Sequence, residues 1–167
     1  AVIALDPAAR PATDDGLLHE VSILLKDNID AVGFATTAGS LALVDHRPAD
    51  DAFLVARLRD AGAVILGKTN LSEFAFFTTT NAPSGYSSLG GQVLNAYDAD
   101  ANPSGSSSGS ATAAAAGLAA LTVGTETSGS IISPSAAQGI VGMRPTVGLA
   151  SRTGIRERRI AKPDEAS

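Results

Sequence analysis

Serine hydroxyls crowd one short stretch of this chain, and they are its first candidates for chemistry. The segment NPSGSSSGSATAAAAG, residues 102–117, places five serines within seven positions before it turns into alanines. A second group, GTETSGS at 124–130, ends in Ser130. A serine hydroxyl is a weak nucleophile, so a catalytic serine needs a base that takes its proton. The first question is therefore which base this chain offers.

Histidine is not a suitable base here. Residues 105–109 match the G-x-S-x-G pattern of nucleophile elbows, but an elbow serine is followed along the chain by its acid and its histidine. Both histidines, His19 and His46, lie upstream. A Ser-His-Asp hydrolase is therefore not favoured. The scarcity of histidine and the absence of cysteine also argue against a zinc site and a cysteine nucleophile.

Two lysines that follow apolar runs could serve as the base instead. Lys26 ends the run SILLK, and Lys68 follows AVILG. A lysine can accept a proton when burial and its neighbours lower its pKa. The spacing alone leaves both lysines open.

Residues 62–69 also match the phosphate-loop pattern G-x-x-x-x-G-K-[ST]. A phosphate loop follows a strand and precedes a helix, so that its backbone N–H groups can surround the phosphates. Here a helical pattern precedes Gly62, and the four middle residues are apolar and typical of a strand. We therefore do not expect nucleotide binding.

The elements that must position these residues alternate along the chain. Apolar runs predict strands at 22–26, 63–66 and 121–123. Helical spacing predicts helices at 50–61, ending at Gly62, and at 110–120, and a further helix after the group at 124–130. Residues 1–20 carry few patterned signals. The alternation predicts an α/β fold with a largely parallel sheet.

The composition fits one small domain. The chain has 167 residues, of which 44% are hydrophobic, and its net charge of −5 offers no basic surface for nucleic acid. It shows no apolar run of membrane-spanning length and no targeting signal, so we expect a soluble, cytoplasmic protein. From Arg152 the sequence becomes highly charged, which predicts an exposed tail. We divide the chain into a core at 1–155 and an atypical charged tail at 156–167.

Several motifs, taken together and in order, strongly resemble the amidase signature family. The resemblance runs from about Leu17 to Ile155, and the sequences of the serine-rich motifs most resemble those of bacterial peptide amidases. The motifs are KDN at 26–28, TTAGS at 36–40, GKTNLSEF at 67–74, GSSSGSA at 105–111, GTETSGS at 124–130 and GMRPT at 142–146.

This resemblance implies a Ser-cisSer-Lys triad. By motif alignment the nucleophile is Ser130, the relay is Ser106 after a cis peptide bond, and the base is Lys26. Lys68 belongs to the wider signature and not to the triad. The backbone N–H groups of Thr127, Ser128, Gly129 and Ser130 would form the oxyanion hole.

The neighbours of the triad are expected to support it without taking part in the chemistry. These are Ser107, Asp27 and Thr125, together with Asn28 and Glu126. Ser107 is also a candidate for orienting the nucleophile. Ser107, Ser108 and Ser110 are expected to hydrogen-bond within the loop and to cap the alanine-rich helix, whose small side chains serve close packing. Ser72 and Glu73 are interpreted as the start of a helix.

The implied fold is a mixed, largely parallel sheet covered by helices, of which this chain carries the N-terminal part. The implied function is hydrolysis of a carboxamide C–N bond through an acyl-enzyme, without metal or organic cofactor. Two alternatives stay open: an amidotransferase A-type subunit that releases ammonia for a partner, and a truncated, inert amidase-like domain. The partners would be a small-molecule or peptide amide and, to complete the fold, a second copy or another chain.

Three departures from the family pattern stand out. Ser128 replaces a glycine of the common GGS ending, and Glu20-Val21-Ser22 replaces a glycine-isoleucine-proline turn. Family members also continue for several hundred residues. A sheet cut short leaves an open edge and an uncovered apolar face. We therefore expect these 167 residues alone to be poorly soluble or inactive.

Overall fold

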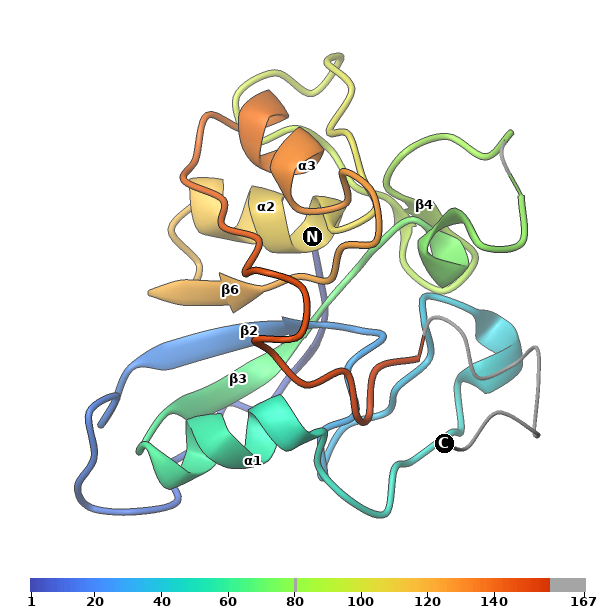
Figure 1. Ribbon diagram of the computed structural model, residues 1–167. Helices are drawn as coiled ribbons and strands as arrows, with labels where there is room; N and C mark the ends of the chain where they lie inside the picture. Colours follow the sequence, from blue (N-terminus) through green and yellow to red (C-terminus); the bar gives the residue numbers. More distant parts are fainter. Residues whose placement is uncertain (80, 157–167) are drawn as a thin grey trace.

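The computed structural model describes residues 1–79 and 81–156, and its regular elements alternate as the sequence predicts (Figure 1). The principal elements are β1 (Val2–Leu5), β2 (Ser22–Lys26), α1 (Phe53–Asp60), β3 (Val64–Thr69), α2 (Ser108–Ala115), β6 (Leu121–Val123) and α3 (Ile132–Ala137). The smaller ones are β4 (Tyr86–Ser87), β5 (Gly91–Gln92) and two 3-10 turns, η1 (Leu41–Leu43) and η2 (Glu73–Phe76).

The main sheet has the strand order β1-β3-β2-β6. Strand β2 is central and runs parallel to both β3 and β6, whereas β1 is antiparallel to β3. Ile23, Leu24 and Leu25 of β2 are at most 1% exposed, as expected for a parallel strand that is covered on both faces. The predicted mixed, largely parallel α/β sheet is confirmed.

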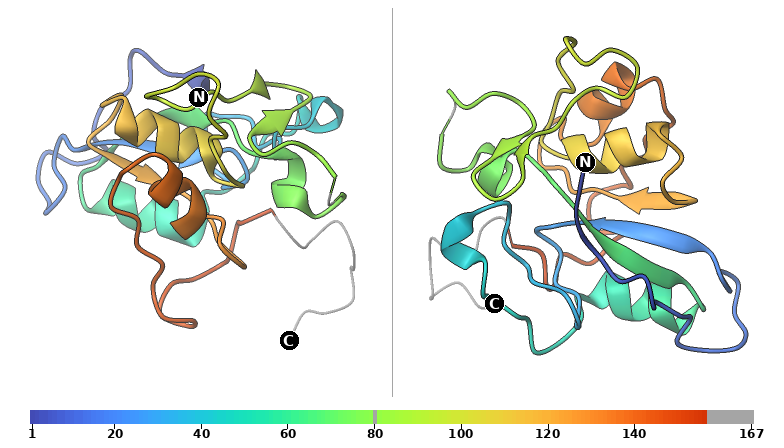
Figure 2. Two further views of the ribbon diagram at one scale, coloured as in Figure 1. Left: turned by 90° about the horizontal axis from the view of Figure 1, so that it is seen from above. Right: turned by 180° about the vertical axis from the view of Figure 1, so that it is seen from behind.

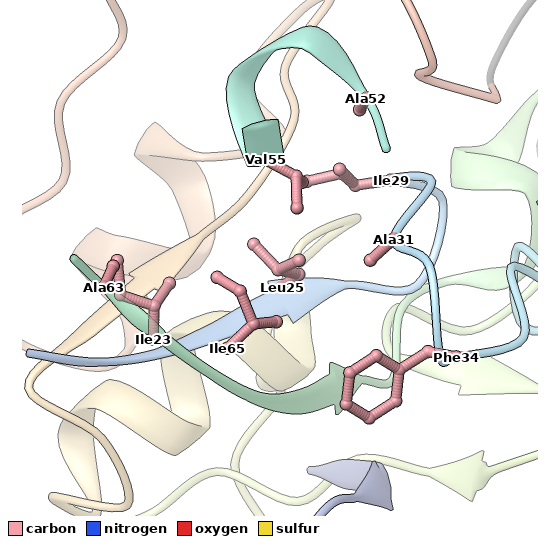
Figure 3. Close-up of a cluster of buried hydrophobic side chains, with 9 residues drawn as sticks. All are labelled: Ile23, Leu25, Ile29, Ala31, Phe34, Ala52, Val55, Ala63 and Ile65. Carbon is pink, nitrogen blue, oxygen red and sulfur yellow. The ribbon is translucent and has the colours of Figure 1, made fainter. Parts of the chain in front are cut away.

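Helices cover the two faces of this sheet. Helix α1 lies on one face, and α2 with α3 lies on the other (Figures 1 and 2). On the α1 face, Ile23, Leu25 and Ile65 of the sheet pack with Val55 of the helix in the main apolar cluster (Figure 3). Both faces are therefore covered around the central strand.

Helix α2 lies close to the sheet because its residues are small. Added at Gly109, a Cβ atom would lie 2.3 Å from the carbonyl oxygen of Asn70. The predicted packing role of this small-residue helix is thus visible in the structure. The predicted caps differ: Ser107 is the residue at the N-cap but its side chain makes no capping hydrogen bond, and Ser108 and Ser110 lie inside the helix.

Both long helices end at a glycine with a positive φ angle. Helix α1 stops before Gly62 as predicted, with Gly62 N–H bonded to Arg59 and Ala63 N–H bonded to Leu58. Helix α2 stops in the same way before Gly117, so the prediction of a helix to residue 120 was wrong. In each case the left-handed glycine allows the chain to satisfy the last carbonyl groups and turn away.

Strand β3 continues to Thr69, beyond the predicted end at residue 66. Gly67, Lys68 and Thr69 therefore lie in a buried strand, and the phosphate-loop pattern has no loop. No sequence pattern predicted β1, which extends the sheet beyond β3.

An exposed tail was predicted from Arg152 onward; Arg152 and Thr153 are exposed, but Gly154 and Arg156 are half-buried and contact the turn after β2. Arg156 N–H donates to the carbonyl oxygen of Asn28 at 2.7 Å, and Gly154 accepts from Asp30 N–H at 2.9 Å. The Arg156 guanidinium also pairs with the buried Asp30 carboxylate at 2.8 Å. This segment fastens the turn that follows β2. The remaining predicted tail, 157–167, lies outside the described residues.

Part of the apolar surface is uncovered. Within the described residues β6 pairs with β2 alone, which leaves its other edge open. In the segment after α3, Val141 is 99% exposed and Val147 is 88% exposed. The structure thus has the open edge and the exposed apolar residues that the sequence predicts. In the same part of the chain, every helix is too short or too polar to cross a membrane.

Candidate active site

The two candidate lysines are both fully buried, and the sheet separates them. In the parallel pairing of β2 with β3, Lys26 lies beside Thr69 and Lys68 lies beside Leu25. Side chains alternate between the two faces of a sheet. Lys26 therefore points to the α2 face and Lys68 to the opposite face, so only one of them can reach the serine-rich loop.

That lysine is Lys26. Its Nζ atom lies 2.8 Å from Ser106 Oγ, 2.8 Å from Thr125 Oγ1 and 3.3 Å from the Thr125 carbonyl oxygen. Asn28 Nδ2 donates to the same Thr125 hydroxyl at 3.0 Å. The amine is thus fixed against one serine of the crowded loop by neighbours from the turn after β2 and from the segment after β6.

Ser106 is 0% exposed, and the backbone directly before it is tightly packed. The Gly105–Ser106 peptide bond is cis, as the family resemblance implies. A Cβ atom at Gly105 would lie 2.5 Å from Ser72 Oγ, so this position accommodates only glycine without a shift. The Ser106 carbonyl oxygen accepts from Ser72 N–H at 3.0 Å, which anchors the loop to the chain after β3.

Ser107 joins the two serine-containing loops. Its N–H donates to the Ser130 carbonyl oxygen at 3.0 Å. Because Ser107 directly follows Ser106, this hydrogen bond places the Ser130 backbone near Ser106. The Ser107 hydroxyl donates to the Thr125 carbonyl oxygen at 3.1 Å and accepts from Thr125 N–H at 3.2 Å. The predicted support residues Ser107 and Thr125 therefore lie at the centre of the arrangement, and Ser107 holds Ser130 through backbone.

The loop that carries Ser130 ends at the start of α3. Thr127 and Ser128 are exposed, and Ser130 is half-buried. Gly129 has a φ angle of +83°, a conformation that glycine adopts without strain. The oxyanion-hole role of this loop stays a prediction.

Glu126 underlies that loop. Its Oε2 atom accepts from Ile131 N–H at 2.7 Å and from Ile132 N–H at 2.9 Å. Burial by itself would raise the pKa of the Glu126 carboxyl, but the N–H groups of Ile132, Ile131 and Gly129 and the charge of Arg144 together lower its pKa. Sequence reasoning assigned no role to Arg144, because its partner lies in another motif.

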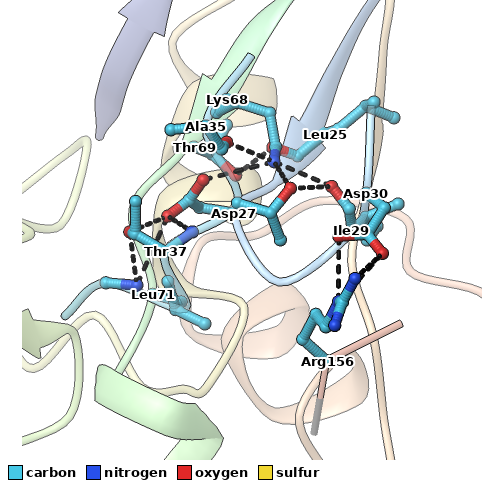
Figure 4. A network of polar contacts seen from close by, with 12 residues as sticks. Leu25, Asp27, Ile29, Asp30, Ala35, Thr37, Lys68, Thr69, Leu71 and Arg156 are labelled. Atoms are coloured by element: carbon cyan, nitrogen blue, oxygen red, sulfur yellow. Dashed lines mark hydrogen bonds and ion pairs between the residues drawn. The ribbon is translucent and has the colours of Figure 1, made fainter. Parts of the chain in front are cut away.

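On the opposite face, Lys68 is neutralised by Asp27 (Figure 4). Lys68 Nζ lies 3.2 Å from Asp27 Oδ1 and donates to the carbonyl oxygens of Ile29 at 2.7 Å and Ala35 at 3.1 Å. Burial lowers the pKa of Lys68, and the charge of Asp27, its hydrogen bond and the charge of Asp30 offset this only in part. Lys68 therefore has its own acceptors, away from Ser106.

Asp27 is the link between this network and the candidate base. Its Oδ2 atom accepts from Thr37 N–H at 3.1 Å, from the Thr37 hydroxyl and from Gly39 N–H at 3.3 Å. These contacts give the TTAGS motif a physical role that sequence spacing did not reveal. Asp27 supports the site from behind, because it directly follows Lys26 in the chain.

Ser72 and Glu73 stand at the start of a helical turn, η2, as predicted. The Ser72 side chain makes no capping hydrogen bond to η2, however, and its hydroxyl accepts from Gly85 N–H at 2.9 Å. Glu73 accepts from Ser88 N–H at 2.6 Å. Both side chains thus hold the β4–β5 hairpin region. Nowhere in the described ranges do three His, Asp or Glu side chains gather as metal ligands would.

Comparison with known proteins agrees with this geometry. The model of the Amidase family matches residues 4–165. The chain belongs to the Amidase family. The predicted resemblance to amidase signature proteins is therefore confirmed.

Individual Amidase relatives are similar over most of this chain. A relative from Arabidopsis thaliana, named a probable amidase, is 52% identical over 140 residues, which are 83% of this chain and 27% of the relative. The A-type subunit of the glutamyl-tRNA(Gln) amidotransferase of Natronomonas pharaonis is 49% identical, over 86% of this chain and 33% of its own length. This chain thus spans about a quarter to a third of such relatives.

Among solved structures, the native peptide amidase of Stenotrophomonas maltophilia superposes with a TM-score of 0.86 at 54% identity. The superposition covers 93% of this chain and 34% of the peptide amidase. The A-type subunit of the glutamyl-tRNA(Gln) amidotransferase of Thermotoga maritima superposes with a TM-score of 0.78 at 33% identity, over 93% of this chain and 33% of that subunit. Both types of Amidase protein share the fold described above.

Proposed function

We propose that this chain carries the catalytic residues of an amide hydrolase that cleaves a carboxamide C–N bond through an acyl-enzyme on Ser130. The supporting observation is the 2.8 Å contact between Lys26 Nζ and Ser106 Oγ, both fully buried. The Ser107–Ser130 backbone hydrogen bond sets the nucleophile loop beside this pair. The fold thus joins three motifs that lie far apart in the sequence.

In this proposal Lys26 reacts as a neutral amine. The Ser130 hydroxyl passes its proton to the Ser106 oxygen, while the Ser106 hydroxyl passes its own proton to Lys26 Nζ. The Ser130 oxygen then bonds to the carboxamide carbon, and the carbonyl oxygen becomes an oxyanion. A relay serine is needed because a positioned base must lie within hydrogen-bond reach of the proton it takes, and Lys26 has Ser106 at that distance.

The second half of the reaction reverses the transfer. The Lys26 ammonium returns its proton through Ser106 to the nitrogen of the leaving group, and the C–N bond breaks. Water then adds to the Ser130 ester, giving up a proton along the same path, and the released Ser130 oxygen regains a proton. Thr125 and Asn28 keep Lys26 pointed at Ser106 throughout, since Thr125 binds the amine and Asn28 binds Thr125.

The substrate class follows from the similarity to peptide amidase. The solved peptide amidase is 54% identical to this chain, against 33% for the solved amidotransferase subunit. This difference favours a peptide or small-molecule amide that is hydrolysed by water. The curated amidotransferase relative at 49% identity supports the second candidate, in which ammonia from the same chemistry passes to a partner protein.

A fluorophosphonate probe tests the proposal on this chain, because labelling needs the nucleophile and its base but not a complete substrate pocket. We expect labelling at Ser130 that is lost in Ser130→Ala and strongly slowed in Lys26→Ala. Ser133→Ala is the matched control: this serine is exposed, three positions on, and its loss should leave labelling unchanged.

Three results would count against the proposal. An unlabelled chain whose circular dichroism shows a folded protein would favour the inert alternative. Labelling of another serine would remove Ser130 as the nucleophile. Ammonia release that depends on glutamine and on added partner proteins would favour the amidotransferase alternative.

A further inference from the structure

We propose that Glu126 is a positioning residue that fixes the backbone directly after Ser130, and that Arg144 holds Glu126 in place for this task. The inference rests on the proposed function, in which Ser130 is the nucleophile. It assigns Glu126 no contact with substrate; Glu126 acts through the peptide groups next to Ser130.

The first observation is where the hydrogen bonds of Glu126 go. Its carboxylate accepts from the N–H groups of Ile131 and Ile132, which directly follow Ser130. One carboxylate oxygen therefore binds two successive N–H groups after the nucleophile and closes residues 126–132 into a ring.

The second observation is that the carbonyl group of Ser130 is held from the other direction. It accepts from Ser107 N–H at 3.0 Å, and Ser107 is the direct neighbour of Ser106. The peptide group between Ser130 and Ile131 is thus bound at its carbonyl oxygen by Ser107 and at its N–H by Glu126, which restricts the backbone that carries the Ser130 side chain. A serine restricted in this way is presented to the relay hydroxyl without a search over loop conformations.

The third observation concerns the charge of Glu126. Its side chain is 4% exposed, and Arg144 Nη1 lies 3.4 Å from its Oε1 atom. A bare carboxylate this close to the nucleophile loop would oppose the negative charge that develops on the substrate oxygen. Arg144, from the segment after α3, compensates that charge and holds the second oxygen, which leaves Oε2 for the loop N–H groups.

Glu126 also provides what α3 lacks. The residue at the N-cap of α3, Ile131, has no side chain that could accept a hydrogen bond. The N–H groups at the start of a helix need acceptors, and Glu126 supplies one from outside the helix. A cap alone would affect only stability. A positioning role predicts, in addition, a slower reaction of Ser130 in a protein that is still folded.

The test compares the second-order rate constant of fluorophosphonate labelling at Ser130 with the urea midpoint of unfolding. We expect Glu126→Ala to lower the labelling rate by about 100-fold, the effect that a displacement of the reacting group by about 1 Å can have. Glu126→Gln keeps an acceptor oxygen and should lose about 10-fold or less. The rate effect should be present under conditions in which each variant is fully folded.

Glu73→Ala is the matched control. Glu73 also accepts a backbone N–H, from Ser88 at 2.6 Å, but in the β4–β5 region. It should lower the urea midpoint and leave the labelling rate within about 2-fold of wild type. If Glu126→Ala labels as fast as Glu73→Ala, Glu126 is only a structural cap and the inference is overturned.

Arg144 provides a second measurement if Glu126→Ala fails to fold. Arg144→Met should slow labelling several-fold, and Arg144→Lys, which keeps a positive charge, should restore most of the rate. Equal labelling of wild type and Arg144→Met would contradict the role of Arg144. Should wild type label elsewhere than at Ser130, the proposed function itself fails; normal Ser130 labelling in every variant overturns this inference alone.

Discussion

Replacement of Lys68 by methionine should destabilise the fold strongly. Lys68 is fully buried and faces Asp27, which is 1% exposed. Methionine fills a similar volume but removes the positive charge. Asp27 would then keep a buried negative charge without a counter-charge, and the carbonyl groups of Ile29 and Ala35 would lose their shared donor.

The expected loss is about 3 kcal/mol of unfolding free energy, the lower end of the cost of breaking a buried ion pair. We choose the lower end because Asp27 keeps its hydrogen bonds from Thr37 and Gly39. A loss of this size is a large fraction of the roughly 5–15 kcal/mol that stabilises a typical domain. With a urea m-value of about 2 kcal/mol/M it corresponds to a midpoint shift of about 1.5 M.

Urea unfolding followed by circular dichroism measures this shift. The double variant Asp27→Asn/Lys68→Met is the control, since it removes both charges while the asparagine oxygen can still accept from Thr37 and Gly39. It should be more stable than Lys68→Met alone. A midpoint for Lys68→Met within about 0.3 M of wild type, or a double variant that is the least stable of the three, would refute the reasoning.

Three further predictions concern backbone contacts, pH and the clasp, by which we mean the contacts of Gly154 and Arg156 with Asn28 and Asp30. Gly109→Ala should lower stability by about 2 kcal/mol or more in urea unfolding, because the added Cβ would lie 2.3 Å from the backbone carbonyl oxygen of Asn70; a midpoint equal to wild type would contradict it. The pKa of Glu126 is lower in the folded chain than its ordinary value of 4.5, so its contribution to stability is present above that value and is lost as pH falls through the folded-state pKa. Unfolding midpoints measured between about pH 5 and about pH 3 should therefore fall less steeply in Glu126→Gln, and identical slopes would count against this. Arg156→Ala should cost about 1–2 kcal/mol in urea unfolding, since Asp30 loses a two-point charged partner, and Arg152→Ala, on an exposed residue nearby, should cost little.

Local signals in the sequence predicted the elements that depend on local chemistry. The run at 22–26 formed β2 with the predicted bounds, and Gly62 ended α1 where a left-handed glycine was expected. The same rule applied to Gly117 would have placed the end of α2 correctly. The alanines beyond it favoured helix, but the glycine terminated it.

Long-range pairing could not be predicted in this way. Strand β1 forms because β3 offers it a free edge, and the clasp of Arg156 on Asp30 joins residues far apart in the chain. The many charged residues around Arg156 favoured an exposed tail, because the sequence alone does not reveal which distant residue a charged side chain pairs with. The pairing of Lys26 with Ser106 was implied by family resemblance, and spacing alone had left Lys26 and Lys68 equivalent.

The clasp formed by Gly154 and Arg156 affects the order in which the contacts of this fold can form during translation. Strand β2 and its lysine emerge early, yet the turn behind them is closed by these two residues, which emerge more than a hundred residues later. A nascent chain halted between these points already carries Lys26, Ser106 and Ser130, but Asn28 and Asp30 still lack their last backbone partners. The turn that follows Lys26 can therefore gain these two backbone contacts only after residue 156 has been synthesised.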